Sequence, residues 1–167
     1  MRTHKVSATI AVSFLMFASV CLIGCDGQRN VSDRDIEFVS RSEVRELLAD
    51  QAAQPGEPRV ILLDPRPVSD YVAGHLPTAR SLLLSGVQAD EGRDPLIRRY
   101  ENIIVYGEHP SSAVAAALAK RMMRIKYDDV RVYDGGVADW TAAGLPLEQG
   151  TPAGNAPPIR RPLSGTR

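Results

Sequence analysis

Residues 103–106 read Ile-Ile-Val-Tyr, residues 107–111 read Gly-Glu-His-Pro-Ser, and residues 112–118 read Ser-Ala-Val-Ala-Ala-Ala-Leu. The first run has no polar break, which is typical of a strand buried on both faces of a parallel sheet. The second run is a short polar loop, and the alanine-rich third run predicts a helix. The carboxyl end of a parallel strand faces the crevice in which ligands bind, and the first N–H groups of the next helix can bind an anion. The stretch therefore predicts an α/β fold with its candidate site in the loop.

Apolar runs and turn residues predict the elements on both sides of this stretch. Further strands are expected at 36–39, 60–63, near 79–84 and at 130–133. Helices are expected at 41–53, 68–73, 96–100 and 137–143, and the first of them begins with a capping box formed by Ser40 and Glu43. Strands that alternate with helices indicate a parallel sheet. We therefore predict a five-stranded parallel sheet with helices on both faces.

The first residues have the pattern of an export signal. A basic start, Met-Arg-Thr-His-Lys, precedes an uncharged apolar run from residue 6 to residue 24. The run is also long enough to span a bilayer, so an uncleaved anchor is the alternative. Leu22-Ile23-Gly24-Cys25 resembles the bacterial lipobox, in which the cysteine is lipidated and becomes the first residue.

The lipobox match divides the chain into four predicted parts. Residues 1–24 are a signal peptide, 25–35 a lipidated tether, 36–148 the folded domain, and 149–167 a disordered proline-rich tail. The predicted location is the bacterial cell envelope, on the outer side of the cytoplasmic membrane (its periplasmic face). The predicted membrane contact is the lipid on Cys25.

The charge balance argues against one class of partner. The sequence has 20 basic and 20 acidic residues, and loss of residues 1–24 removes Arg2 and Lys5 but no acid. The remaining chain therefore has a formal charge of −2. It lacks the basic excess that binds the phosphate backbone, so no nucleic acid partner is expected.

The cysteines restrict the chemistry of the mature chain. The sequence contains only Cys21 and Cys25. Cys21 would leave with the signal peptide, and the lipid would alkylate Cys25. The mature chain is therefore expected to have neither a free thiol nor a disulfide.

Two groups of residues in the predicted domain resemble a known family. Asp64-Pro65-Arg66, Asp70-Tyr71 and Gly-His-Leu-Pro-Thr-Ala at 74–79 resemble the first signature of rhodanese domains. The second, C-terminal signature is similar to Tyr-Asp-Gly-Gly at 133–136, Trp140 and Ala-Gly-Leu-Pro at 143–146. The resemblance covers about residues 35–148 and implies the rhodanese fold.

The resemblance also implies what the loop should contain. Rhodaneses have a six-residue loop that opens with cysteine and closes with arginine, and the cysteine thiolate carries sulfane sulfur as a persulfide. Without a gap, Gly107 stands at the cysteine position and Ser112 at the arginine position. A loop shorter by one residue would move the arginine match but would bring in no cysteine. Related phosphatases use the same cysteine, so this observation argues against them as well.

The candidate site consists of the loop residues, which are Gly107, Glu108, His109, Pro110, Ser111 and Ser112. Ser111 and Ser112 have no evident general base and are expected to cap the following helix. His109 is expected to be an exposed loop residue, with a role as acid, base or ligand contact as the alternative. Glu108 is expected to repel anions.

Other conspicuous residues are predicted to be structural. His75 should make a hydrogen bond in its turn, Arg66 and Asp70 have the spacing of a local ion pair, and Trp140 should fill the core. Two mature histidines without a cysteine do not make a metal cluster, so no metal or other cofactor is expected.

Three classes of function remain open. The first is a membrane-tethered rhodanese-like lipoprotein without sulfurtransferase activity, a binding module for an unknown protein or a weakly bound small anion. The second is a thiosulfate or persulfide sulfurtransferase, which needs a thiol that the mature sequence does not contain. The third is a structural envelope protein that makes contacts through its tail or an outer face.

Overall fold

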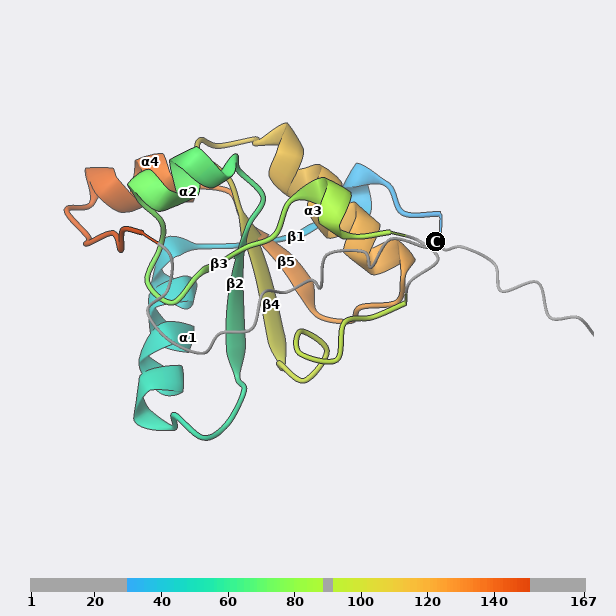
Figure 1. The fold of residues 1–167 in the computed structure, drawn as a ribbon, viewed down its shortest axis with the longest axis horizontal. Coiled ribbons are helices and arrows are strands. Elements are labelled where there is room, and N and C mark those ends of the chain that lie inside the picture. The colour runs from blue at the N-terminus through green and yellow to red at the C-terminus, as the bar shows by residue number, and fades with distance from the viewer. Residues whose placement is uncertain (1–29, 89–91, 151–167) are drawn as a thin grey trace, which may run out of the picture.

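The five strands form one parallel sheet in the computed structural model, which describes residues 30–88 and 92–150 (Figure 1). The strand order in the sheet is β1-β5-β4-β2-β3. The strands are β1 (Glu37–Val39), β2 (Val60–Asp64), β3 (Arg80–Ser81), β4 (Asn102–Tyr106) and β5 (Val130–Tyr133). The helices are α1 (Arg41–Ala53), α2 (Val68–Ala73), α3 (Ala113–Arg124) and α4 (Gly136–Ala142), with single 3-10 turns at η1 (Asp33–Asp35) and η2 (Leu84–Gly86).

Strand β4 is the centre of the sheet, as its apolar sequence predicts. It pairs in parallel with β2 on one side and with β5 on the other. Residues 103–106 are buried, because helices cover both faces of the strand. The carboxyl end of β4 therefore opens into the loop at 107–112 between two neighbouring strand ends.

Each face of the sheet has its own hydrophobic core. On one face, Ile103 and Val105 of β4 pack in the cluster that contains Leu118 and Met122 of α3. On the other face, Ile104 and Tyr106 pack in the cluster that includes Trp140 of α4 and residues of α1 and α2. Figure 1 shows α1 and α3 on opposite sides of β2 and β4. The expectation of a parallel sheet with helices on both faces is confirmed.

Two predicted elements differ from the expectation, one in length and one in kind. The third strand contains only residues 80–81 instead of extending to residue 84, because the chain turns into η2 immediately afterwards. The segment at 96–100 forms hydrogen-bonded turns instead of a helix. Asp94 accepts from the backbone N–H of Leu96 at 2.7 Å, as a cap should, but the chain must enter β4 at Asn102 before a helix can extend.

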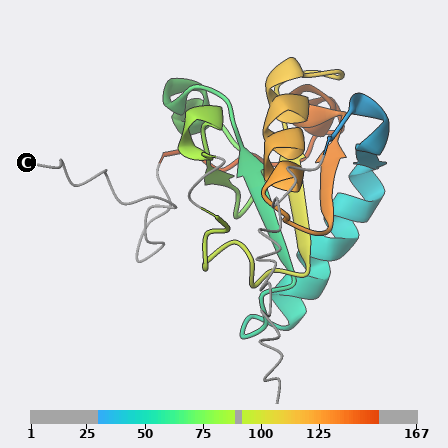
Figure 2. The ribbon, with the colours of Figure 1, turned by 90° about the vertical axis from the view of Figure 1, so that its right-hand side faces the viewer.

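The residues just before β1 pack against α3. Val31 is buried, and the guanidinium of Arg124 donates to its carbonyl oxygen at 3.3 Å. Asp33 in η1, blue in Figure 2, forms an ion pair with Lys120 at 2.5 Å. The predicted tether thus contacts the domain through Val31 and Asp33.

The predicted signal peptide and most of the predicted tail, 151–167, lie outside the described residues, as do residues 25–29 with the lipidation position Cys25. Within residues 30–88 and 92–150, no helix is long and apolar enough to cross a membrane. The prediction of a lipid anchor concerns the part of the chain before residue 30.

Three buried tyrosines lie in the core next to α1, α2 and α4. The hydroxyl of Tyr71 donates to the carbonyl oxygen of Ala79 at 2.7 Å, and that of Tyr106 accepts from the N–H of Leu76 at 3.2 Å. Burial, followed by the negative charge of Asp64, raises the pKa of Tyr71 to about 12 and raises the pKa of Tyr106 further. Burial and the carboxylate of Asp139 likewise raise the pKa of Tyr133.

These tyrosines predict a loss of stability at high pH. The unfolded chain releases phenolic protons near pH 10, whereas the folded chain retains them to pH 12 or above. The contribution is therefore complete below pH 10 and is lost as the pH rises through the folded values. Urea denaturation should give a lower free energy of unfolding at pH 11 than at pH 9, and Tyr71→Phe should make the difference smaller. Phenolate absorbance near 295 nm that titrates equally in folded and unfolded protein would contradict this explanation.

Candidate functional site

The loop at 107–112 is bonded to the beginning of α4. The carbonyl oxygen of Gly107 accepts from the N–H of Val137 at 3.0 Å, and that of Glu108 accepts from the N–H of Ala138 at 2.9 Å. On the far side of the loop, the N–H of Ser111 donates to the Asp134 carboxylate at 2.7 Å. The loop that follows β4 is therefore fixed to the segment that follows β5.

Gly136 makes this close approach possible. Its φ of 61° lies in the left-handed region, which disfavours residues with a Cβ. A Cβ at this position would lie 2.5 Å from the carbonyl oxygen of Gly107 and 2.9 Å from that of Glu108. The Gly-Gly turn of the second family signature thus serves to place one backbone directly against another.

The inside of the loop is occupied by the side chain of Ser112. A Cβ added to Gly107 would lie 2.1 Å from Ser112 Oγ and 2.3 Å from Ser112 Cβ. Ser112 is the N-cap residue of α3, as predicted, but its side chain makes no capping hydrogen bond because it is turned towards Gly107. The expected hydroxyl cap is therefore wrong for Ser112, although its carbonyl oxygen accepts the first helical bond from Ala116 at 3.1 Å.

The remaining loop residues face outwards to different degrees. His109, Pro110 and Ser111 are exposed, and Glu108 is partly buried. Ser111 has a φ of 59°, which the loop imposes where its N–H turns towards Asp134. His109 lies where an exposed loop histidine was expected.

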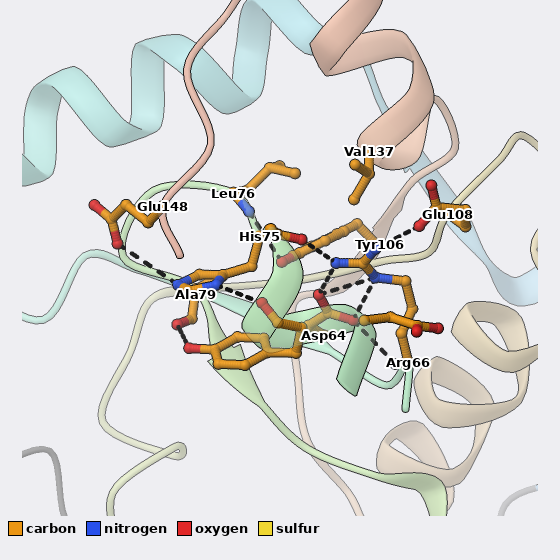
Figure 3. A network of polar contacts seen from close by, with 12 residues as sticks. Asp64, Arg66, His75, Leu76, Ala79, Tyr106, Glu108, Val137 and Glu148 are labelled. Atoms are coloured by element: carbon orange, nitrogen blue, oxygen red, sulfur yellow. Dashed lines mark hydrogen bonds and ion pairs between the residues drawn. The ribbon is translucent and has the colours of Figure 1, made fainter. Parts of the chain in front are cut away.

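A buried arginine connects the loop to the end of β2. Arg66 donates from Nε to both carboxylate oxygens of Asp64 at 3.0 and 3.1 Å, and from Nη2 to Asp64 Oδ2 at 2.8 Å. Nη2 also donates to the carbonyl oxygen of Gly74 at 2.6 Å, and Nη1 forms an ion pair with Glu108. Figure 3 shows the guanidinium between the two carboxylates. Burial disfavours the charged form, but Asp64 and then Glu108 outweigh it, so the pKa of Arg66 is raised above its ordinary value.

The predicted ion pair between Arg66 and Asp70 is not formed. Arg66 precedes α2, and its side chain turns back to the end of β2, whereas Asp70 lies in the exposed first turn of α2. The sequence pattern did not indicate the two carboxylates that pair with Arg66, which are those of Asp64 and Glu108. The usable signal was Asp64, a carboxylate at the end of a fully apolar strand, because a buried charge needs a charged or hydrogen-bonding partner.

His75 and Trp140 have the structural roles that were expected. His75 is buried, its Nδ1 lies 2.8 Å from the carbonyl oxygen of Tyr71, and its ring stacks on that tyrosine with centroids 3.9 Å apart. The buried indole of Trp140 donates to the carbonyl oxygen of Pro146 at 2.9 Å. None of these hydrogen bonds or ring contacts joins either side chain to the loop at 107–112.

The family model described as rhodanese-like domain matches residues 40–143 of the chain. The fold, the two signatures and the position of the loop agree with this match. The chain belongs to the rhodanese-like domain family. This confirms the resemblance seen in the sequence and the α/β fold that it implied.

Individual relatives of this rhodanese-like domain have different names. The thiosulfate sulfurtransferase YnjE of Escherichia coli is 33% identical over 104 residues, which cover 58% of this chain and 22% of that protein. The HTH-type transcriptional regulator Rv0324 of Mycobacterium tuberculosis is 32% identical over 96 residues, covering 58% of this chain and 41% of that protein. The crystal structure of the BH2092 protein from Bacillus halodurans superposes with a TM-score of 0.55 at 21% identity, covering 68% of this chain and 77% of that one. The chain thus spans less than half the length of YnjE and of Rv0324, the two curated relatives.

The contact between Gly136 and the loop predicts a large effect of one methyl group. We expect Gly136→Ala to lower the free energy of unfolding by about 2–5 kcal/mol, because left-handed backbone costs an L-residue about 1–2 kcal/mol and overpacking adds about 1–3 kcal/mol. Gly144→Ala is the matched control, since Gly144 has a φ of 70° but no atom within 4 Å of an added Cβ. It should cost only about 1–2 kcal/mol. Equal losses for the two variants in urea denaturation would show that the approach of the loop to α4 does not matter.

Proposed function

We propose that this protein is a lipid-tethered rhodanese-like module without sulfurtransferase activity, and that it binds a protein or a small anion through its loop. The observation that supports the proposal is the combination of Gly107 at the nucleophile position with Ser112 in the space of its missing side chain. Sulfur transfer through a persulfide needs a thiolate, which both attacks and releases sulfur. No cysteine follows Cys25 in the sequence.

The loop serines are poor substitutes for that thiol. A hydroxyl group forms no persulfide, and it needs an adjacent base to become a nucleophile. Ser112 Oγ is turned towards Gly107, and Ser111 is held through its N–H by Asp134. The loop keeps a defined backbone conformation because hydrogen bonds fix it to α4. Its outer residues are exposed. A fixed and exposed loop suits recognition of a partner.

The anchor is proposed from the sequence alone. The apolar run at 6–24 and the lipobox-like residues before Cys25 support export and lipidation, which would place the domain on the outer side of the cytoplasmic membrane. A lipobox cysteine receives a diacylglyceryl group, and two chains are enough for stable attachment whereas one is marginal.

A sulfurtransferase is the second candidate, favoured by the name of the relative from Escherichia coli. Only the domain is shared, however, because the chain covers 22% of that protein. A structural envelope role is the third candidate and would depend on residues other than the loop.

The first test is sulfur transfer itself. Residues 26–167, produced without the leader, should transfer no sulfur from thiosulfate to cyanide above the protein-free background, because the nucleophile is missing. Turnover that survives dialysis and thiol blocking would support the sulfurtransferase and would direct attention to Ser111, Ser112 and His109.

The same assay can include a variant with a restored thiol. Gly107→Cys should lower the midpoint of thermal unfolding and stay inactive, because its Cβ collides with Ser112 and the loop lacks its arginine. Adding Ser112→Gly removes both clashing atoms and should restore the midpoint, whereas adding Ser112→Ala removes only Oγ and should restore less. If all three variants have the same midpoint, Ser112 does not fill the space beside Gly107.

The second test concerns the anchor. In cells that express the full chain, Cys25→Ala should release the protein from the detergent phase of a phase-partition experiment or block its processing. Ser32→Ala is a control outside the lipobox. Unchanged partition of Cys25→Ala together with an intact N-terminus would instead indicate an uncleaved apolar helix.

A further inference from the structure

The two acidic partners of Arg66 differ in how easily they can be replaced. The side chain of Asp64 is fully buried and accepts from Nε and Nη2, so it occupies one edge of the guanidinium. Glu108 contacts only Nη1, and 46% of its side chain is exposed. The Arg66 side chain as a whole is only 6% exposed. Asp64 contacts Nε and Nη2, whereas Nη1 has the more exposed carboxylate of Glu108 as its acceptor.

The carboxylate of Glu108 can leave without a change in the loop backbone. The backbone carbonyl oxygen of Glu108 accepts from the N–H of Ala138 at 2.9 Å, and that of Gly107 accepts from the N–H of Val137 at 3.0 Å. These bonds fix the main chain but not the side chain. Rotation of the Glu108 side chain into solvent would uncover Nη1 while the loop stays bonded to α4.

The charges also favour exchange over simple addition of an anion. Asp64, Arg66 and Glu108 together carry a net charge of −1, so an anion that approached with Glu108 in place would be repelled. When the Glu108 side chain is removed, Asp64 and Arg66 sum to zero and Nη1 has lost its acceptor. A hydrogen bond from a charged guanidinium to an oxyanion is stronger than one between neutral groups, and a buried donor without an acceptor is costly.

We propose that Arg66 Nη1 is an anion-binding site which Glu108 occupies as an internal ligand, and that a carboxylate or a small oxyanion binds there by displacing the Glu108 side chain. Glu108 then does more than repel anions, as the sequence predicts, because its carboxylate also competes with them directly for Nη1. The intact protein binds free anions weakly, because Glu108 is tethered beside the site and is present at a high effective concentration. A ligand that also contacts the exposed loop residues would compete better than a free ion. The inference rests on the proposed function only in taking the loop as the binding region.

The experiment is rescue of an emptied site. Glu108→Ala removes the internal carboxylate, and formate or sulfate is then supplied at constant ionic strength, with chloride as the reference. The midpoint of thermal unfolding of Glu108→Ala should rise saturably with formate, with a dissociation constant at least tenfold below that of the unaltered protein. Glu108→Gln should not respond, because its amide oxygen still accepts from Nη1. The NMR signal of the Arg66 Nε–H group should shift with formate in Glu108→Ala alone.

Glu57→Ala is the matched control. Glu57 also pairs with an arginine, Arg59 at 3.2 Å, but its side chain is 63% exposed and that of Arg59 is 32% exposed. This variant should respond to formate and chloride alike. Glu108→Ala that folds in formate but not in equal chloride would support the proposal, whereas failure to fold in both, or an equal response to both, would overturn it. Such a failure would not bear on the proposal that the protein lacks sulfurtransferase activity, because sulfur transfer is measured in a separate assay.

Discussion

The hydrogen bonds between the loop carbonyls at 107 and 108 and the first N–H groups of α4 are the constraint on which the site depends. They satisfy donors that every helix leaves free at its beginning, and the acceptors come from the loop that follows β4. The approach is possible only because Gly136 has no side chain. Once the loop backbone is fixed in this way, Ser112 is turned inwards and Glu108 is directed towards Arg66.

A buried charge at the end of β2 imposes the second requirement. Asp64 is fully buried, and a carboxylate in that environment must be paired. Arg66 supplies the pair two residues later, and its remaining donors reach Gly74 and the loop. Three segments that follow different strands or helices are thereby joined through one guanidinium. Asp64 and Arg66 both belong to the first family signature. The physical role of this signature is to connect the end of β2 to the loop through ion pairs.

The sequence predicted what depends on local pattern. Unbroken apolar runs located β2 and β4, short and mostly apolar stretches located β1 and β5, and the spacing of Ser40 and Glu43 predicted the capping box that opens α1. What it could not predict depends on the folded backbone. Arg66 and Glu108 are 42 residues apart, so only the parallel pairing of β2 with β4 brings them together. The inward turn of Ser112 likewise follows from the shape of the loop, whereas propensity alone favours a hydroxyl cap.

The pairing of β1 with β5 has a consequence for how the chain folds. Glu37 lies opposite Arg131, so the first strand of the sheet has its partner almost one hundred residues later. Strand β5 is also a partner of β4, which means that the sheet stays incomplete at two places until residue 133 is available. Pairings so distant in sequence slow folding, since a long loop must close before any contact forms. During synthesis β1 would therefore remain unpaired until β5 has been made, so the five-stranded sheet can close only when most of the described domain is already present.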